Sequence, residues 1–166
     1  NPCHLWSASS SLAEGTKTMK LNKIHYIFDE SIKDKSFKNS ILRKKINYHP
    51  KNSNVFVVIG GDGFMLETLK KYQKYNTPFY GMNKGTFGFL MNKFKSNNIE
   101  KSILKSKLIT ISALEMTSIS TKNIKKSAIA INEISLLRQS RQAASLQIQV
   151  NNKILIKKLI SDGILI

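Results

Sequence analysis

A carboxylate set among three glycines is the feature of this sequence with the clearest chemical potential. Val55 to Ile59 is an apolar, mostly β-branched run that predicts a buried strand, and Gly60-Gly61-Asp62-Gly63 follows it directly. Helical spacing from Phe64 to Tyr75 predicts that a helix comes next. Asp62 is therefore expected where a strand passes into a helix, which is where open α/β sheets bind ligands.

This loop could bind phosphate groups while Asp62 does chemistry beside them. Glycines let backbone N–H groups approach an anion closely, and a helix N-terminus favours negative charge. A carboxylate would repel a phosphate, which favours a role as a metal ligand or as a base acting on a nucleophilic hydroxyl. The alternative is structural, because Gly-Gly-Asp-Gly suits a turn and Asp caps helices well. Other residues must decide between the two.

Composition limits the classes of protein to which the chain could belong. Its 166 residues are 41% hydrophobic, which allows one packed domain or one domain plus part of another. No apolar run approaches the roughly 20 residues of a membrane span, and residues 1–18 lack the pattern of a signal peptide. The single Cys3 excludes an internal disulfide and a cysteine-based metal cluster, and favours a cytoplasmic location. The three histidines are scattered, so no metal site is expected from them.

A formal charge of +17 makes a basic nucleic-acid-binding module an alternative function. The basic residues are spread along the chain, however, and only three of the 27 are arginine. Base recognition and phosphate forks favour arginine over lysine. Lys, Asn and Ile are enriched together, which indicates a compositional bias of the genome rather than a selected binding face. No specific nucleic-acid partner is therefore expected, although anionic nucleotides would be attracted.

From Met19 onward the sequence alternates predicted strands and helices, which is typical of a parallel, Rossmann-like sheet. Besides the elements around Asp62, the strands are Lys23–Phe28 and Pro78–Met82, and the helices are Lys35–Lys45 and Asn98–Ser106. A second glycine-bearing loop, Asn83 to Leu90, follows the later strand. Residues 1–18 are small, polar and without period, so they are expected to be a disordered or non-native lead-in.

The pattern changes near Lys107, where helical spacing stops. Four successive strands are predicted, at Leu108–Ser120, Ser127–Leu137, Ala144–Val150 and Lys153–Ile160. Asn151-Asn152 suits a tight hairpin turn between the last two. We therefore expect an α/β nucleotide-binding domain at 19–106 and an incomplete, antiparallel β-rich domain at 107–166. The apolar ending after Asp162-Gly163 suggests a C-terminally truncated piece of a longer protein.

Three separated motifs together resemble the NAD kinases. They are Gly60-Gly61-Asp62-Gly63, the stretch Gly81 to Leu90, and Asn132-Glu133, which is expected inside a strand. The residues from Asn132 to Ala144 are similar to the bacterial, alphaproteobacterial branch, and Ser161 to Ile166 resembles a later strand of the family. Lipid kinases and phosphofructokinases share the first motif but not the Asn-Glu strand. The resemblance covers about residues 20 to 166 and implies an NAD kinase-like fold.

The resemblance implies transfer of the γ-phosphoryl group of ATP to the 2′-hydroxyl of the adenosine ribose of NAD, with a divalent metal, expected to be Mg²⁺. Asp62 matches the family's proton acceptor and would also contact NAD, as would Gly63. An ionised Asp is a weak base, so positioning would supply most of the effect. The glycines of the first loop would open room for phosphates, and three residues of the second loop would shape its neighbourhood: Asn83, Gly85 and Gly88.

The same resemblance matches three residues of the β-rich part to NAD-contacting positions: Asn132, Glu133 and Asp162. Each has a structural alternative. Asn132 and Glu133 could simply alternate outward from a strand, and Asp162 could be a turn residue. Phe87 and Phe89 are expected in the core rather than stacking on a base. Ile160 occupies a position that is often basic in the family, which is a departure from the pattern.

The resemblance also implies assembly as a homodimer or homotetramer, with the NAD site completed by segments beyond this sequence. The chain by itself is then expected to be inactive, with exposed strand edges. Another kinase sharing the Gly-Gly-Asp-Gly loop, acting on a lipid or a sugar, is the alternative enzyme. The sequence leaves open ATP or polyphosphate as donor and NAD or NADH as acceptor.

Overall fold

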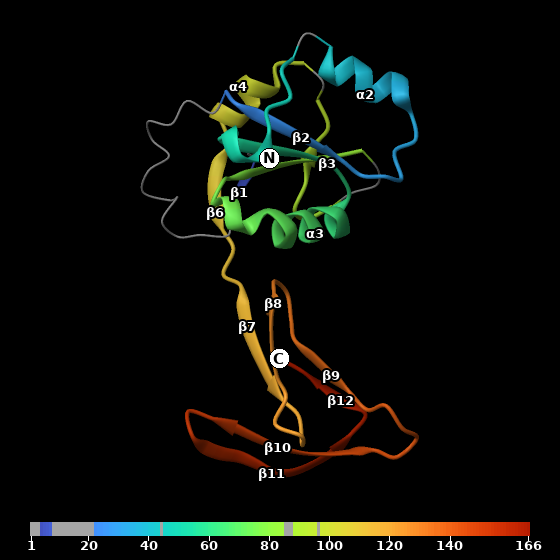
Figure 1. Cartoon of the computed structure of the whole chain (residues 1–166), viewed down its shortest axis with the longest axis vertical. Coiled ribbons are helices and arrows are strands. Elements are labelled where there is room, and N and C mark those ends of the chain that lie inside the picture. The colour runs from blue at the N-terminus through green and yellow to red at the C-terminus, as the bar shows by residue number, and fades with distance from the viewer. Residues whose placement is uncertain (1–3, 8–21, 44, 85–87, 96) are drawn as a thin grey trace. The chain divides into compact units, whose positions relative to one another are not determined.

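The computed structural model describes residues 4–7, 22–43, 45–84, 88–95 and 97–166. The chain divides into two compact units, Asn1–Ser112 and Ala113–Ile166. The first unit carries helices and a largely parallel sheet, and the second consists of antiparallel strands (Figure 1). This confirms the expected fold class, an α/β part followed by the start of an antiparallel β domain.

Four parallel strands form the centre of the first unit. They are β2 (Ile24–Phe28), β3 (Val55–Gly60), β4 (Phe79–Asn83) and the short β5 (Asn92–Lys93). β3 lies between β2 and β4, and β5 pairs with the edge of β4 that faces away from β3. Parallel neighbours place their carboxyl ends at the same edge of the sheet, and that edge is where a ligand site is expected.

Helices cover both faces of this sheet. Figure 1 shows α2 (Lys35–Leu42) and α4 (Ile99–Leu104) on one side and α3 (Asp62–Tyr72) on the other. Ile41, Ile99 and Ile103 pack with Val57 and Ile59 in one buried cluster. Every residue of β3 is buried, which explains why its sequence is a continuous apolar run without alternation.

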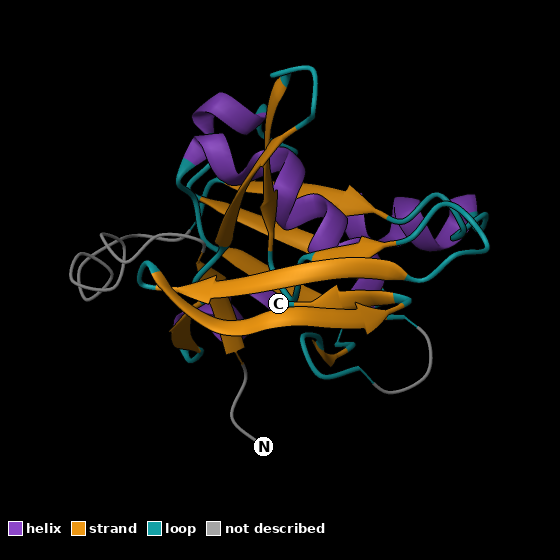
Figure 2. Ribbon diagram, turned by 90° about the horizontal axis from the view of Figure 1, so that it is seen from below, coloured by secondary structure: helices purple, strands orange, loops and turns teal. Residues whose placement is uncertain are grey.

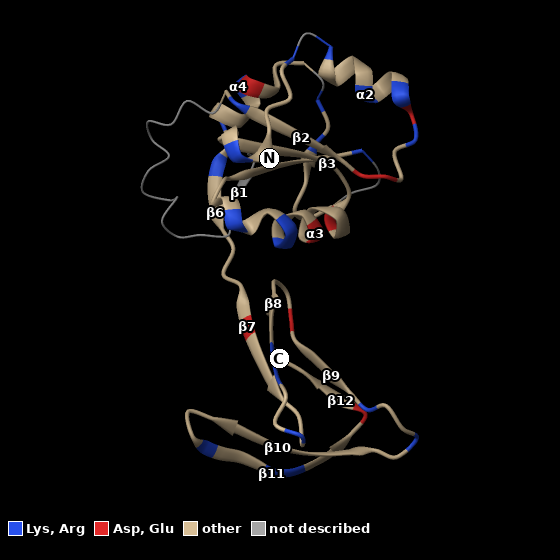
Figure 3. Ribbon diagram, in the orientation of Figure 1, with Lys and Arg blue, Asp and Glu red and all other residues tan. Residues whose placement is uncertain are grey.

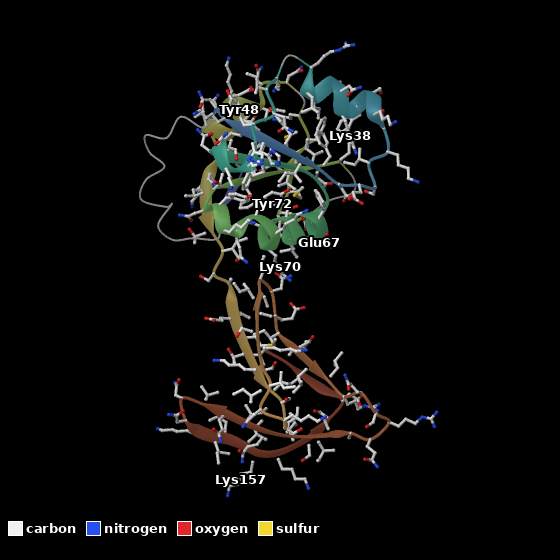
Figure 4. The ribbon with its side chains drawn as sticks, in the orientation of Figure 1. Lys38, Tyr48, Glu67, Lys70, Tyr72 and Lys157 are labelled. Atoms are coloured by element: carbon white, nitrogen blue, oxygen red, sulfur yellow. The ribbon has the colours of Figure 1, made fainter. Side chains whose placement is uncertain are left out.

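An aromatic cluster fills the α3 side of the sheet. The ring of Phe56 lies 5.3 Å from that of Tyr72, 5.8 Å from that of Tyr75 and 5.1 Å from that of Phe79 between centroids. Figure 4 shows Tyr72 between α3 and the sheet, whereas Lys70 extends from the outer side of the helix. Such packing fixes α3, and therefore its N-terminus, against β3.

Several helix boundaries differ from the prediction. α3 begins at Asp62 instead of Phe64 because Gly61, in an extended conformation, is its N-cap residue, so the glycine loop enters the first turn. Its predicted last turn is a separate 3₁₀ turn, Gln73–Tyr75, which ends at Asn76 in the left-handed region. α2 ends at Leu42 rather than Lys45, with Arg43 as its C-cap.

The N-terminal segment and the domain boundary also differ from the expectation. His4–Ser7 forms strand β1, which pairs with β4 in the antiparallel sense and with β6 (Lys107–Thr110) in the parallel sense. Residues 1–18 therefore contain a strand rather than only a lead-in. Because β6 joins the first sheet, the second unit begins at Ala113 instead of Lys107. The predicted strand Leu108–Ser120 is accordingly two strands, one in each unit.

The second unit consists of three two-stranded antiparallel ladders. β7 (Leu114–Ile119) pairs with β8 (Lys125–Ala130), β9 (Ser135–Leu137) with β12 (Gly163–Leu165), and β10 (Ala144–Val150) with β11 (Lys153–Ser161). The β10–β11 hairpin is the long ribbon pair that faces the viewer in Figure 2. Asn151 and Asn152 form its turn with φ values of 50° and 64°, as the tight-turn prediction requires.

No residue of 113–166, a range that the structure describes completely, is buried. Large apolar side chains are exposed on several strands, among them Leu137, Leu155 and Ile160. The strands are thus formed, but their apolar sides lack the covering layer that a β domain needs. None of the described helices is long and apolar enough to span a bilayer.

Candidate functional site

Asp62 lies at the carboxyl edge of the parallel sheet. β3 ends at Gly60, Gly61 caps α3, and Asp62 is the first helical residue. The strand register places Gly60 beside Asn83 at the end of β4, and Ile59 beside Phe28 at the end of β2. An acidic residue in the first turn of a helix interacts favourably with the helix dipole. The strand-to-helix position predicted for Asp62 is confirmed.

The second glycine-bearing loop holds the Asp62 carboxylate. The backbone N–H of Phe89 donates to Oδ2 at 2.6 Å, and the backbone N–H of Leu90 donates to Oδ1 at 3.1 Å. These donors are more than twenty residues away in the sequence. The two loops that the sequence singled out separately therefore meet at one carboxylate, and its orientation is fixed by backbone groups on both oxygens.

The glycines at this edge serve two different purposes. A Cβ atom on Gly60 would lie 2.8 Å from Cδ1 of Phe64 and 3.0 Å from Cβ of Asp29, so close packing requires glycine there. Among the described residues, no atom lies within 4 Å of where a Cβ on Gly61 or Gly63 would stand. As far as the described residues go, the start of α3 is thus open on the side of these two glycines, which leaves room for an approaching ligand.

The end of β4 adds a cation to this edge. The backbone N–H of Lys84 donates to the carbonyl of Gly60 at 3.2 Å. Its Nζ lies 4.2 Å from the ring centroid of Phe37 and 5.8 Å from that of Phe94, a cation–π arrangement. Lys84 therefore ties the entry of the second loop both to the glycine loop and to α2. Gly85, which the sequence assigned to the same loop, is outside the described residues.

Phe89 was expected in the core, but this expectation is wrong, because 97% of the residue is exposed. Its backbone is held at Asp62 while its ring faces solvent. The same expectation for Phe87 falls outside the described residues.

Sequence reasoning missed Asp29, which follows β2 directly. Its backbone N–H donates to the carbonyl of Ile59 at 2.9 Å, and its Oδ1 accepts from the N–H of Ser31 at 2.8 Å. It therefore lines the same sheet edge as Gly60. The signal was present, since a polar residue directly after a predicted parallel strand belongs to this edge.

Asn132 and Glu133 do not lie inside a strand. They lie in the connection between β8 and β9, which bends at Ile131 and Asn132, and both are exposed. The predicted strand Ser127–Leu137 is interrupted because its two halves have different partners: β8 pairs with β7, whereas β9 pairs with β12. The chain must leave one ladder before it joins the next. The bend frees both side chains from the alternation of a strand.

Asp162 lies at a bend between β11 and β12 and is bound by Arg138. The guanidinium Nε of Arg138 donates to Oδ1 of Asp162, and Nη1 donates to the carbonyl of Ser140. The backbone N–H of Arg138 also donates to the carbonyl of Asp162, at 2.9 Å. The carboxylate side chain is nevertheless 79% exposed, so it is oriented but still accessible. Arg138 is a residue whose role the sequence did not assign.

Within the second unit, the Asn132–Glu133 pair and Asp162 are not brought together. Glu133 precedes β9 and Arg138 follows it, a separation on the order of 15 Å at about 3.3 Å per residue. The β9–β12 register places Asp162 at the Arg138 end, since Gly163 pairs with Leu137. These residues therefore form two separate groups on this unit.

The described residues hold no cluster of metal-ligating side chains. Across them, no group of three or more His, Cys, Asp or Glu side chains could hold a metal ion. The sheet edge offers one oriented carboxylate and an open helix start, and Lys84 at the end of β4 has its ammonium group over Phe37.

A family model for the ATP-NAD kinase N-terminal domain matches residues 9–107, more than half of the chain. The chain belongs to the NAD kinase family. The match includes the glycine loop with Asp62 and the whole second loop up to Leu90. It also begins within the N-terminal segment that the sequence analysis set aside.

Annotated relatives agree with this assignment. The NAD kinase of Caulobacter vibrioides is 43% identical over 117 residues, which is 70% of this chain and 45% of the relative. The NAD kinase of Zymomonas mobilis subsp. mobilis is 36% identical over 151 residues, 89% of this chain and 58% of the relative. Both organisms are alphaproteobacteria, so the expected branch is confirmed. The chain spans about half the length of the curated relatives it matches.

A solved structure supports the fold. An NAD kinase from Archaeoglobus fulgidus, crystallised in complex with ATP, superimposes with a TM-score of 0.52 over 86% of this chain and 59% of that chain. The two sequences are 20% identical, so the likeness concerns the fold. It spans more of the chain than the N-terminal family model does.

Proposed function

We propose that the protein to which this chain belongs transfers the γ-phosphoryl group of ATP to the 2′-hydroxyl of the adenosine ribose of NAD, giving NADP and ADP. The observation that carries the proposal is the Asp62 carboxylate, oriented by two backbone donors at the carboxyl edge of a sheet of the NAD kinase family. Family membership favours this reaction over the lipid kinase, the sugar kinase and the nucleic-acid-binding module.

Asp62 would orient the ribose hydroxyl and accept its proton. Each carboxylate oxygen has two lone-pair sites, and the N–H groups of Phe89 and Leu90 occupy one on each. A hydroxyl can therefore still bond to the carboxylate. As the hydroxyl oxygen forms its bond to the γ-phosphorus, the bond from that phosphorus to the bridging oxygen breaks and ADP leaves. Positioning in line would supply most of the effect.

The open helix start would receive phosphate groups. Gly61 and Gly63 leave free space at the first turn of α3, and a helix N-terminus favours anions. Mg²⁺ in kinases is held largely by substrate phosphates, so we treat it as part of the ATP substrate. Asn83, Gly85 and Gly88 would shape the second loop beside this helix start.

In the second unit, we propose that Asn132, Glu133 and Asp162 contact NAD. Their exposure supports this role: the bend presents Asn132 and Glu133 to solvent, and Arg138 orients Asp162 without covering it. Assembly as a homodimer or homotetramer and a cytoplasmic location belong to the same proposal, the first resting on the family resemblance and the second on the single cysteine.

The test is NADP formation by the full-length protein from NAD, ATP and Mg²⁺. Asp62→Asn is expected to lower kcat roughly 10²- to 10⁴-fold, the usual effect of losing a positioned base. Glu67→Gln is the matched control, because Glu67 lies exposed on the same helix and should leave activity unchanged. A wild-type protein that makes no NADP refutes the proposed function, and full activity of Asp62→Asn refutes the role of Asp62.

A further inference from the structure

Gly88 and the carboxylate of Asp62 approach each other more closely than any side chain would permit. A Cβ atom on Gly88 would lie 2.4 Å from Oδ1, 2.8 Å from Cγ and 3.1 Å from Oδ2 of Asp62. Real Cβ atoms essentially never show contacts under 3.0 Å. Any other residue at position 88 would therefore displace the carboxylate or the loop.

Backbone conformation does not explain this glycine. Among the described residues no glycine has a positive φ, so a side chain would be allowed at position 88 if the space existed. Gly61 and Gly63 show the contrast, because a Cβ there would meet no atom of the described part of the chain within 4 Å. The requirement at position 88 is steric, and the atoms that impose it are those of Asp62.

The next two residues supply the bonds that hold this carboxylate. Phe89 donates to Oδ2 at 2.6 Å and Leu90 donates to Oδ1 at 3.1 Å. Gly88, Phe89 and Leu90 thus form a continuous stretch of backbone against the carboxylate. A side chain at position 88 would push the carboxylate out of this orientation and so weaken the two hydrogen bonds from the amides.

We propose that Gly88 is a positioning residue for phosphoryl transfer. Its missing side chain lets the amides of Phe89 and Leu90 clamp Asp62 in the orientation that accepts the proton of the ribose hydroxyl. The role of Gly88 is therefore to admit the carboxylate and not a phosphate group. The inference rests on the proposed function, because the orientation of Asp62 matters for catalysis only if this carboxylate accepts the proton of the ribose hydroxyl.

The steric part is tested without activity, in the full-length protein, by a double-mutant cycle on urea unfolding. Gly88→Ala should lower the unfolding midpoint in the wild type but have little effect in Asp62→Ala, where the methyl group finds room. Gly163→Ala is the control, because its Cβ would meet Leu136 and Leu137 instead. Gly163→Ala should lower the unfolding midpoint by the same amount in the wild type and in Asp62→Ala. Equal losses from Gly88→Ala in both backgrounds would overturn the inference.

The catalytic part is tested by kinetics on the folded Gly88→Ala protein. Displacing a catalytic group by about 1 Å can cost on the order of 10²-fold, so kcat should fall by about that factor. KM for NAD and ATP should change much less, because the clamp holds the base and not the substrates. A wild-type kcat in the folded variant would overturn the positioning role.

The two proposals fail in distinguishable ways. If the wild type makes NADP and the unfolding cycle is additive, the clamp is refuted while the kinase assignment stands. If the wild type makes no NADP, the kinase assignment is refuted and the role of Gly88 in transfer falls with it, whatever the cycle shows.

Discussion

At the scale of single residues, close contact and burial decide what each position tolerates. Gly60 and Gly88 are glycines because neighbouring atoms occupy the space of a Cβ, whereas Gly61 and Gly63 border open space. Tyr26 shows the opposite situation, a polar atom without a role. Its side chain is buried in the α2-side cluster, and its hydroxyl has no hydrogen-bond partner among the described residues.

Tyr26→Phe is therefore expected to stabilise the protein. An unsatisfied buried hydroxyl costs about 1–3 kcal/mol, and the ring packing is retained, so the free energy of unfolding should rise by up to that amount. Urea unfolding at pH 7 measures the change. A loss of stability would show that the hydroxyl is satisfied.

Alkaline pH gives a second readout of the same variant. Burial, and secondarily the charge of Glu100, raises the pKa of Tyr26 well above its ordinary value of 10.0. The folded state then holds its proton where the unfolded state releases it, so stability falls as pH rises above about 10. In Tyr26→Phe, the free energy of unfolding should therefore fall less than in the wild type as pH rises above about 10.

At the scale of helices and strands, the residues at the ends of an element contribute strongly to its stability. Asp34 is the N-cap residue of α2, and its Oδ1 accepts from the N–H of Phe37 at 3.0 Å and from the hydroxyl of Ser36 at 2.7 Å. The Phe37 bond, followed by the Ser36 bond, lowers the pKa of the Asp34 carboxyl from its ordinary 3.8. The ionised cap thus stabilises the helix whose ring at position 37 lies under Lys84.

Asp34→Ala should lower the melting temperature in a pH-dependent way. Because the folded pKa is depressed, the contribution is complete above pH 3.8 and is lost as pH falls through the folded value. The difference from the wild type should therefore shrink in acid. Asp34→Asn is the control, since asparagine caps about as well without a charge. A difference that stays constant with pH would contradict the role of the ionised cap.

At the scale of the whole molecule, burial and charge are distributed unevenly. The first unit has a closed core, whereas no residue of 113–166 is buried. Figure 3 shows basic residues on elements of both units. The dispersed charge agrees with a compositional bias better than with a nucleic-acid interface, while the exposed apolar strands of the second unit call for a covering layer.

The isolated chain is expected to bind an apolar dye such as ANS through its second unit. Leu155, on β11, is 66% exposed, so Leu155→Lys should reduce dye fluorescence while changing the unfolding free energy by less than about 0.5 kcal/mol. Leu69→Ala, at a buried position of α3, is the contrast and should cost about 2–5 kcal/mol. A large loss from Leu155→Lys would show that the β face is covered in solution.

Features that depend on neighbouring residues along the chain could be predicted from the amino-acid sequence. The apolar run of β3, the glycine break and the helical spacing together placed Asp62 at a strand-to-helix junction, and Asn151-Asn152 specified a hairpin turn. Periodicity and turn chemistry are local, so they are legible without a structure. The agreement of separated motifs also identified the family that the comparisons confirmed.

Which distant segments meet became visible with the fold. It closed Phe89 and Leu90 on Asp62, gave Gly88 its steric role, bound Arg138 to Asp162 and added β1 to the sheet. It also bent the chain at Asn132 and Glu133, where one ladder gives way to another. These outcomes depend on strand partners and register, which an alternating pattern leaves open because many pairings bury the same apolar residues. For this reason Asp62 could be found in the sequence, while the clamp that orients it could not.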